Sequence, residues 1–196
     1  MQEICIFDDC IDKDIIDDLE KNLLYNYSTN WEYHSKTIPE DLVENNIIKY
    51  SISENLTKNI KDLPFFVHAI VSGDQIKDTR LGPICARLIT QFVGRTNFPI
   101  KDIIRLKANL TMPSNNVSDE QYNSIHIDED REHYALIVYL NESDGDTIFF
   151  NNKEIIKEVS PKKGRIVAFD GNILHANKTP KKYKDRLVLN IDMTKV

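Results

Sequence analysis

The stretch "NSIHIDEDREHYALIVYLN" (123–141) decides the fold. It places His126, Asp128, Glu129 and Asp130 a few residues before an unbroken run of aliphatic and aromatic residues. Because side chains in a strand repeat every two residues, His126 and Asp128 lie on one face of an extended segment and can chelate one ion. A second interpretation is a solvated turn that leads into a core strand. The same residues therefore predict either half of a metal site or a polar turn.

Short apolar segments recur through the second half of the chain, about every 8–12 residues. They are separated by turn-rich sequences such as "NESDG" (141–145) and "DGN" (170–172). This pattern is typical of a sandwich, a jelly roll or a barrel. The predicted strands cover 102–112, 134–141, 146–150, 153–159, 165–169, 173–176 and 186–193. We therefore predict a mainly β fold with helices packed outside its core.

The first half has the spacing of three and four residues between apolar positions that is typical of helices. The expected elements are helices over 15–24, 53–63 and 83–93, and a strand over 64–72. Asp12 or Asp14 is the expected cap of the first helix. We predict a single domain, 1–196, in which 1–100 is a largely helical support region and 101–196 is the jelly-roll catalytic core.

Composition limits the classes of function. The chain has 196 residues, of which 31 are acidic and 25 basic, and its formal net charge is −6. Surfaces that bind nucleic acid need an excess of Lys and Arg, so nucleic acid is not an expected partner. Three cysteines give neither a disulfide framework nor a paired zinc spacing. With no signal-peptide pattern and no apolar run near the roughly 18 residues of a membrane span, we expect a soluble, cytoplasmic protein.

A third ligand for the ion has to come from a distant part of the chain. His175, in "GNILHANKT" (171–179), follows Asp128 by 175 − 128 = 47 positions, which leaves room for several short strands. Two histidines and one carboxylate form the facial triad of non-haem Fe(II) oxygenases, with positions open for a co-substrate and O₂. A hydrogen-bonded loop histidine is the alternative for His175, because short motifs also occur by chance.

Arg186 supports the metal-site interpretation. It follows His175 by eleven positions and begins an apolar strand. A guanidinium in such a strand is costly unless it meets an anion, and its planar fork can bind a carboxylate through two hydrogen bonds. The alternative is a surface arginine paired with Asp185 or Glu158.

These segments together resemble a known family. The series "HID" (126–128), "YALIVYLN" (134–141), "DGDTIFF" (144–150), "VSPKKGRIVAFDGNILHANKT" (159–179) and "RLVLNIDM" (186–193) is similar to the Fe(II)- and 2-oxoglutarate-dependent dioxygenase superfamily. The similarity is greatest to its prolyl-4-hydroxylase-like branch, which includes many short phage-type proteins. Each motif is short, but all stand in the order and spacing of the family. The resemblance implies a double-stranded β-helix, the jelly roll of cupin-like proteins.

The resemblance also implies roles for individual residues. His126, Asp128 and His175 occupy the positions of the Fe(II) ligands. Arg186 occupies the position that binds the distal carboxylate of 2-oxoglutarate.

Two further positions match co-substrate contacts of relatives. Tyr139, the tyrosine of "YLN", matches a residue that hydrogen-bonds the distal carboxylate, and its alternative is a packed core tyrosine. Asn109 matches a strand position that contacts 2-oxoglutarate in some relatives. Two positions further on, where relatives often have tyrosine, this chain has Thr111. Either Thr111 or Tyr122 is then a candidate for the second polar contact.

The polar residues after Asp128 allow two interpretations. Glu129, Asp130, Arg131 and His133 could line a substrate entrance. A solvated turn is the simpler interpretation of each of them.

The activity implied by the resemblance is oxygenation. A Fe(II) enzyme would use 2-oxoglutarate and O₂, with ascorbate as a candidate reductant, and would release succinate and CO₂ as it hydroxylates an unactivated C–H bond. The acidic composition favours a peptidyl or small-molecule substrate. Two alternatives stay open, a metal-binding cupin-like enzyme without oxidative chemistry and an inactive binding module on the same barrel. The sequence gives no oligomeric state.

Overall fold

The structure is a computed structural model that describes residues 4–38, 40–183 and 185–195. The helices are α1 (Lys13–Leu24), α2 (Glu40–Lys49), α3 (Glu54–Thr57) and α4 (Gly82–Thr96). The strands are β1 (Ile4–Phe7), β2 (Glu32–His34), β3 (Phe65–Ser72), β4 (Gln75–Ile76), β5 (Ile100–Thr111), β6 (Tyr134–Tyr139), β7 (Thr147–Phe150), β8 (Ile155–Val159), β9 (Ile166–Asp170), β10 (Leu174–Asn177) and β11 (Arg186–Lys195). The fold is mainly β with flanking helices, as the sequence predicted.

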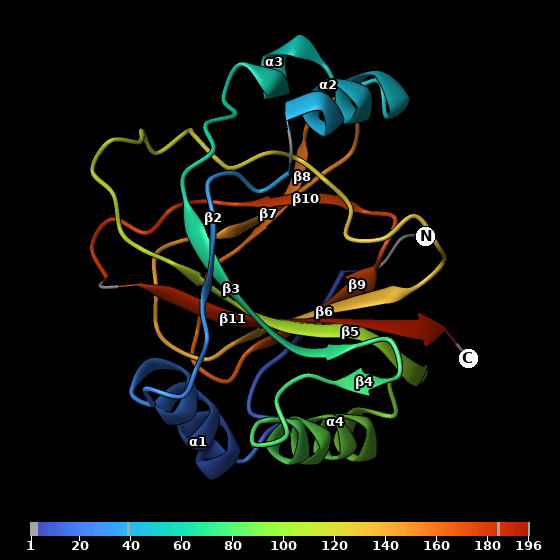
Figure 1. The fold of residues 1–196 in the computed structure, drawn as a ribbon. Coiled ribbons are helices and arrows are strands. Elements are labelled where there is room, and N and C mark those ends of the chain that lie inside the picture. Colours follow the sequence, from blue (N-terminus) through green and yellow to red (C-terminus); the bar gives the residue numbers. More distant parts are fainter. Residues whose placement is uncertain (1–3, 39, 184, 196) are drawn as a thin grey trace.

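A large antiparallel sheet forms the main wall of the barrel (Figure 1). Its strands run in the order β1-β9-β6-β11-β5-β3-β2, and β4 pairs with β3. Strand β11 lies between β5 and β6, so segments distant in the sequence become neighbours. In the register of β5 and β11, Arg186 lies opposite Thr111 and Asp192 lies opposite Arg105. This pairing decides which side chains meet inside the barrel.

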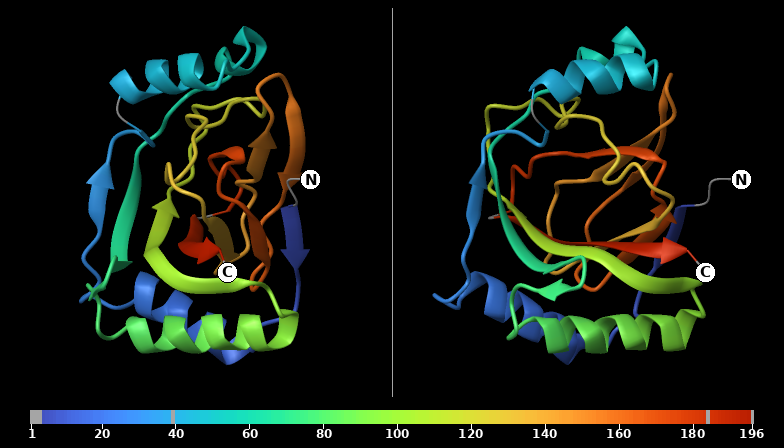
Figure 2. Two further views of the ribbon diagram at one scale, coloured as in Figure 1. Left: turned by 90° about the vertical axis from the view of Figure 1, so that its right-hand side faces the viewer. Right: turned by 45° about the vertical axis from the view of Figure 1, so that its right-hand side comes forward.

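Helices α1 and α4 cover the outer face of the large sheet (Figure 2). Their apolar faces include Leu19 and Leu88, which are fully buried against Leu106 and Leu136 from the sheet. Burial of a leucine side chain contributes about 1.5–3 kcal/mol, so these contacts hold the helical layer in place. Asp12 is at the N-cap position of α1, but its carboxylate accepts hydrogen bonds from α4 and makes no side-chain cap.

A small sheet, in the order β10-β7-β8, faces the inner side of the large one. The backbones of His126 and His175 exchange two hydrogen bonds of 3.0 and 2.9 Å, which fixes the 123–141 segment against β10. Helices α2 and α3 lie at the opposite end of the molecule from α1 and α4 (Figure 1). The two sheets therefore enclose the space into which both histidines project.

The first half of the chain departs from its predicted helical character. The helix predicted over 53–63 is a single turn, α3, and β1, β2 and β4 were not predicted. Strands β1 and β3 enter the large sheet through pairing with β9 and β5, which propensity within the first half cannot reveal. The division of one domain at position 100 stays a prediction. Within the described residues, no helix is both long and apolar enough to span a membrane.

Candidate metal centre and co-substrate cavity

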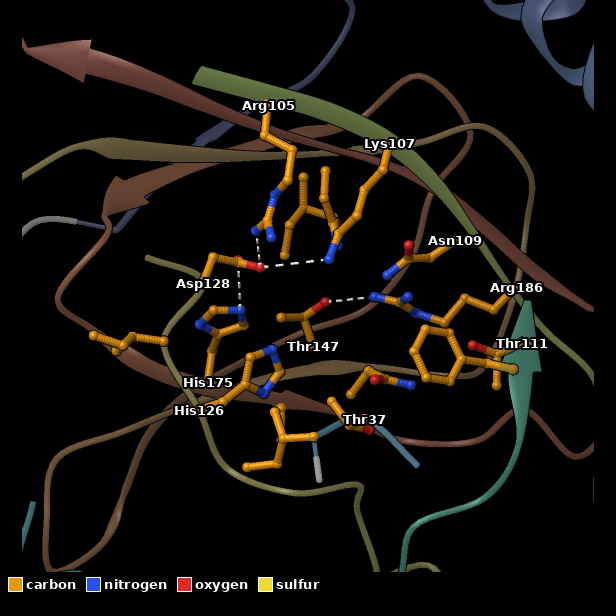
Figure 3. Close-up of a pocket in the computed structure, with 17 residues that line it drawn as sticks. Thr37, Arg105, Lys107, Asn109, Thr111, His126, Asp128, Thr147, His175 and Arg186 are labelled. Carbon is orange, nitrogen blue, oxygen red and sulfur yellow. Dashed lines mark hydrogen bonds and ion pairs between the residues drawn. The ribbon is translucent and has the colours of Figure 1, made fainter. Parts of the chain in front are cut away.

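The structure brings His126, Asp128 and His175 together at one end of a cavity of about 150 Å³. One ligand atom from each residue lies within 4.8 Å of the others. The two imidazole ring centroids are 4.6 Å apart, and the carboxylate oxygen Oδ2 is 3.3 Å from Nε2 of His175. Figure 3 shows the three side chains pointing toward one another. Residues 47 positions apart in sequence thus form one compact donor set.

The orientation of both imidazoles is fixed by backbone carbonyls. Nδ1 of His126 lies 2.9 Å from the Ser124 carbonyl oxygen, and Nδ1 of His175 lies 3.2 Å from that of Ile173. A carbonyl oxygen only accepts, so each Nδ1 donates and each Nε2 is left to face the cavity. Burial, followed by the neighbouring His175, lowers the pKa of His126 to about 4. The His126 ring is therefore neutral at pH 7, the form that binds a metal.

Asp128 is ionised and held from two sides. Burial opposes its ionisation, but the hydrogen bond with His175 and the charge of Lys107 keep the pKa of Asp128 well below its ordinary value. Its Oδ1 accepts a hydrogen bond of 2.8 Å from Nη2 of Arg105, while Oδ2 faces His175. Nε2 of His175 and Oδ2 of Asp128 are both atoms that can bind a metal ion, and they lie 3.3 Å apart. Such a pair fits the chemistry of a metal ligand set.

Arg105 is a component that the sequence analysis missed. Its Nε donates to Oδ2 of Asp192 at 2.8 Å, and its Nη2 lies 2.7 Å from the same oxygen. Asp192 is fully buried, and burial, together with the charge of Asp128, raises the pKa of Asp192 to about 6. The arginine therefore links two buried carboxylates, one of which is a candidate metal ligand. The alternation of polar residues along β5 was the available signal.

Lys107 is the second cation on the inner face of β5. Its Nζ lies 3.8 Å from Oδ1 of Asp128 and lines the same cavity. Burial lowers the pKa of Lys107, and the carboxylate of Asp128 opposes that effect. The metal end of the cavity thus contains two basic side chains that the sequence analysis did not assign.

Arg186 lies at the other end of the cavity and is only 4% exposed. Its Nε donates to the Gly145 carbonyl oxygen at 2.7 Å, and its Nη2 donates to Oγ1 of Thr147 at 2.9 Å. Gly145 permits this approach, because a Cβ there would lie 2.8 Å from Cδ of the arginine. Among the described contacts of the guanidinium, the hydrogen-bond acceptors are uncharged. Glu158, one of the surface partners considered for Arg186, instead pairs with Lys178 at 3.0 Å.

Tyr139 contacts Arg186 through its ring and shares Thr147 with it. The tyrosine is fully buried, and its ring centroid lies 5.5 Å from the guanidinium carbon of Arg186. Its hydroxyl is 2.6 Å from Oγ1 of Thr147, and Thr147, unlike Tyr139, lines the cavity. Burial raises the pKa of Tyr139. Thr147 is therefore the polar group between the tyrosine and the arginine, and the sequence analysis did not single it out.

Asn109 and Thr111 both line the cavity from β5. The buried Oδ1 of Asn109 has no hydrogen-bond partner among the described residues. Tyr122 lies elsewhere, because its hydroxyl donates to the Leu56 carbonyl oxygen at 2.7 Å and its ring packs against Phe150. The candidate role of Tyr122 in the cavity is therefore wrong.

The turn after Asp128 is only partly solvated. Asp130 and Arg131 are exposed, and Asp130 pairs with Lys49. His133 is fully buried, contrary to the expectation of a solvated turn. Its ring lies against Gly171, where a Cβ would lie 2.1 Å from ring atom Cε1. Close packing between this turn and the turn that precedes β10 is the reason for the difference.

Comparison with known proteins agrees with this geometry. Residues 112–191, less than half of the chain, match the family model of the 2OG-Fe(II) oxygenase superfamily. None of the curated proteins matches the chain. The matched segment contains the three converging residues and Arg186. This match confirms the resemblance drawn from the sequence motifs, because the matched residues are similar to 2OG-Fe(II) oxygenases.

Two solved structures share the fold. An oxidoreductase of the 2OG-Fe(II) oxygenase family from Burkholderia pseudomallei superimposes with a TM-score of 0.66 at 11% identity, over 97% of this chain and 85% of that chain. A prolyl hydroxylase from Trichoplax adhaerens, in complex with a hypoxia inducible factor oxygen degradation domain peptide fragment, gives a TM-score of 0.58 at 17% identity. That match covers 98% of this chain and 83% of the other. The likeness confirms the double-stranded β-helix.

Proposed function

We propose that this protein hydroxylates an unactivated C–H bond of a peptidyl or small-molecule substrate, with conversion of 2-oxoglutarate to succinate and CO₂. In this proposal His126, Asp128 and His175 hold Fe(II). The observation that carries it is that one cavity contains both the converging donor atoms and the buried Arg186.

The donor set suits the metal that the family implies. Two imidazole Nε2 atoms and one carboxylate oxygen form a facial set for Fe(II) and leave further positions for ligands. When bound, Fe(II) supplies O₂ activation, in which 2-oxoglutarate is oxidised and decarboxylated while the substrate C–H bond is hydroxylated. The carbonyl oxygens of Ser124 and Ile173 hold the rings in the tautomer that this binding requires.

The other end of the cavity is proposed to bind the distal carboxylate of 2-oxoglutarate. Arg186 has a fixed orientation before any ligand enters, because Gly145 and Thr147 accept two of its hydrogen bonds. Preorganisation of this kind reduces the ordering cost of binding. Tyr139 supports the arginine through its ring and through Thr147, and Asn109 offers an amide to the co-substrate between the two ends.

The proposed substrate class rests on a solved relative and on the lining of the cavity. The peptide in the Trichoplax adhaerens complex makes a peptidyl substrate reasonable for this chain as well. Thr37, Ile38 and Phe65 also line the cavity and offer it a partly apolar wall. Ascorbate as reductant, a cytoplasmic location and the single-domain organisation stay predictions.

The experiment that tests the proposal uses the purified protein with Fe(II), ascorbate and 2-oxoglutarate. We expect slow formation of succinate without a substrate, dependent on both the metal and the protein. Absence of metal-dependent 2-oxoglutarate binding would refute the proposal. A cupin-like enzyme without oxidative chemistry would bind metal but would not need Arg186 to hold a dicarboxylate.

A further inference from the structure

Lys107 forms an ion pair in the cavity but donates no hydrogen bond to a described residue. The side chain projects from the inner face of β5, is 20% exposed, and points to the metal end of the cavity (Figure 3). Its closest acidic atom is Oδ1 of Asp128 at 3.8 Å, beyond hydrogen-bond distance. Among the described residues, no acceptor lies within hydrogen-bond distance of Lys107 Nζ. The ammonium is thus free to donate to a ligand.

The neighbouring carboxylates are already occupied. Oδ1 of Asp128 accepts from Arg105 at 2.8 Å, and Arg105 is itself paired with the buried Asp192. A metal ion bound to Asp128 would also neutralise the negative charge of that carboxylate. Among the described residues, Lys107 and Arg186 are then the cavity cations whose side chains donate no hydrogen bond to a carboxylate. Since unpaired buried cations are costly, an anionic ligand in this cavity has two places to bind.

We propose that Lys107 is the second cation of the co-substrate site and binds the carboxylate of the keto acid end, while Arg186 binds the distal carboxylate. The inference rests on the proposed function. A keto acid that chelates a metal through its carboxylate and keto oxygens places that carboxylate in the immediate surroundings of Asp128. Lys107 Nζ lies in those same surroundings.

The order of residues along β5 agrees with this assignment. Lys107, Asn109 and Thr111 alternate onto the inner face and all line the cavity. Thr111 is opposite Arg186 in the sheet register, and Lys107 is four positions closer to the metal end. One strand therefore offers a cation near the metal and uncharged polar groups toward the arginine, which matches a molecule with a carboxylate at each end.

The test measures binding rather than turnover. Affinity for two probes is determined by calorimetry at saturating Fe(II) without oxygen. 2-Oxoglutarate has both carboxylates, whereas 2-oxopentanoate keeps the chelating keto acid and lacks the distal carboxylate. In Lys107→Met, we expect both affinities to fall by a similar factor, about tenfold or more, because each probe loses one charge-assisted hydrogen bond. In Arg186→Met, only the affinity for 2-oxoglutarate should fall.

Three controls keep the result interpretable. Lys101→Met removes an exposed lysine of the same strand and should change neither affinity. Lys107→Arg keeps the charge and should retain most of the binding of both probes. If Lys107→Met does not fold, as judged by thermal unfolding, Lys107→Gln provides a second neutral variant for the same measurement.

Two outcomes are negative and can be told apart. Unchanged affinity of the neutral Lys107 variants for both probes would overturn the inference. Failure of the unchanged protein to bind 2-oxoglutarate with metal would instead refute the proposed function.

Discussion

At the metal end of the cavity, the three candidate ligands lie among two basic side chains and a second carboxylate. At the other end, one arginine lies among uncharged groups. The metal end depends on a balance of charges in which Asp128, Arg105 and Asp192 hold one another in place. The arginine end depends on hydrogen bonds and packing around Arg186 that need no ligand. Changes to the three candidate ligands or to Arg105 should therefore lower metal affinity, whereas changes at the arginine end should lower only co-substrate affinity.

Replacement of Asp128 should have the largest effect. Asp128→Ala removes the only candidate carboxylate ligand of the set, so we expect metal binding and succinate formation to be lost, with metal affinity at least about 100-fold lower. Calorimetry with Fe(II) without oxygen gives the affinity. Asp130→Ala is the matched control, because Asp130 is exposed and pairs only at the surface with Lys49. Retained metal binding in Asp128→Ala would remove this residue from the ligand set.

Replacement of Arg186 should lower the affinity for 2-oxoglutarate without lowering the affinity for the metal. Arg186→Ala should weaken 2-oxoglutarate binding by about 100-fold, since a buried partner of a carboxylate is worth roughly 2–5 kcal/mol. Metal affinity measured without the co-substrate should stay within about threefold of the original, because Arg186 makes no contact with the ligand set. Unchanged co-substrate affinity would contradict the role given to this arginine.

Replacement of Arg105 tests whether its ion pairs position Asp128 for metal binding. Arg105→Met should reduce metal affinity by about tenfold to 100-fold, as expected for a group that orients a ligand. It should also reduce the free energy of unfolding, because Asp192 is left buried without its partner. Adding Asp192→Asn should recover part of the stability but not the metal affinity. Recovery of both would mean that Arg105 acts only on stability.

Thr147 should give a smaller effect at the arginine end. Thr147→Val removes the hydroxyl that accepts from Arg186 and contacts Tyr139, so the affinity for 2-oxoglutarate should fall by about threefold to tenfold. Metal affinity is the internal control. A loss as large as that of Arg186→Ala would show that the orientation of the arginine depends on this one hydroxyl.

The titration of His126 should give the smallest effect and tests whether burial keeps this candidate ligand neutral. Its pKa of about 4 lies below the ordinary value of about 6.5, so the metal-free ring should stay neutral as the pH falls through 6.5 and take up a proton only near 4. Because the pKa of His126 is lower in the folded state than in the unfolded state, the free energy of unfolding should fall as the pH falls from about 6.5 to about 4. NMR of the ring protons measures the midpoint directly. A midpoint near 6.5 would mean that the ring is not desolvated.

Much of the site was predictable, but not all of it. The period of two placed His126 and Asp128 on one face, and the arginine in an apolar strand signalled an anion site. Arg105 and Thr147 were missed, because each is defined by a partner far along the chain, Asp192 and Arg186 respectively. The sequence predicted that His133 lies in a solvated turn, but its ring packs against Gly171 and is buried.

The sequence by itself determined the β-rich second half, the candidate ligands and the family resemblance, because local periodicity and motif order are properties of short segments. Only the tertiary structure decided which charges meet. The antiparallel register of β5 with β11 puts Arg105 opposite Asp192 and Thr111 opposite Arg186. Strand pairing of this kind depends on contacts between distant segments, so the charge balance around the metal end and the position of Lys107 beside Asp128 became visible only in the folded molecule.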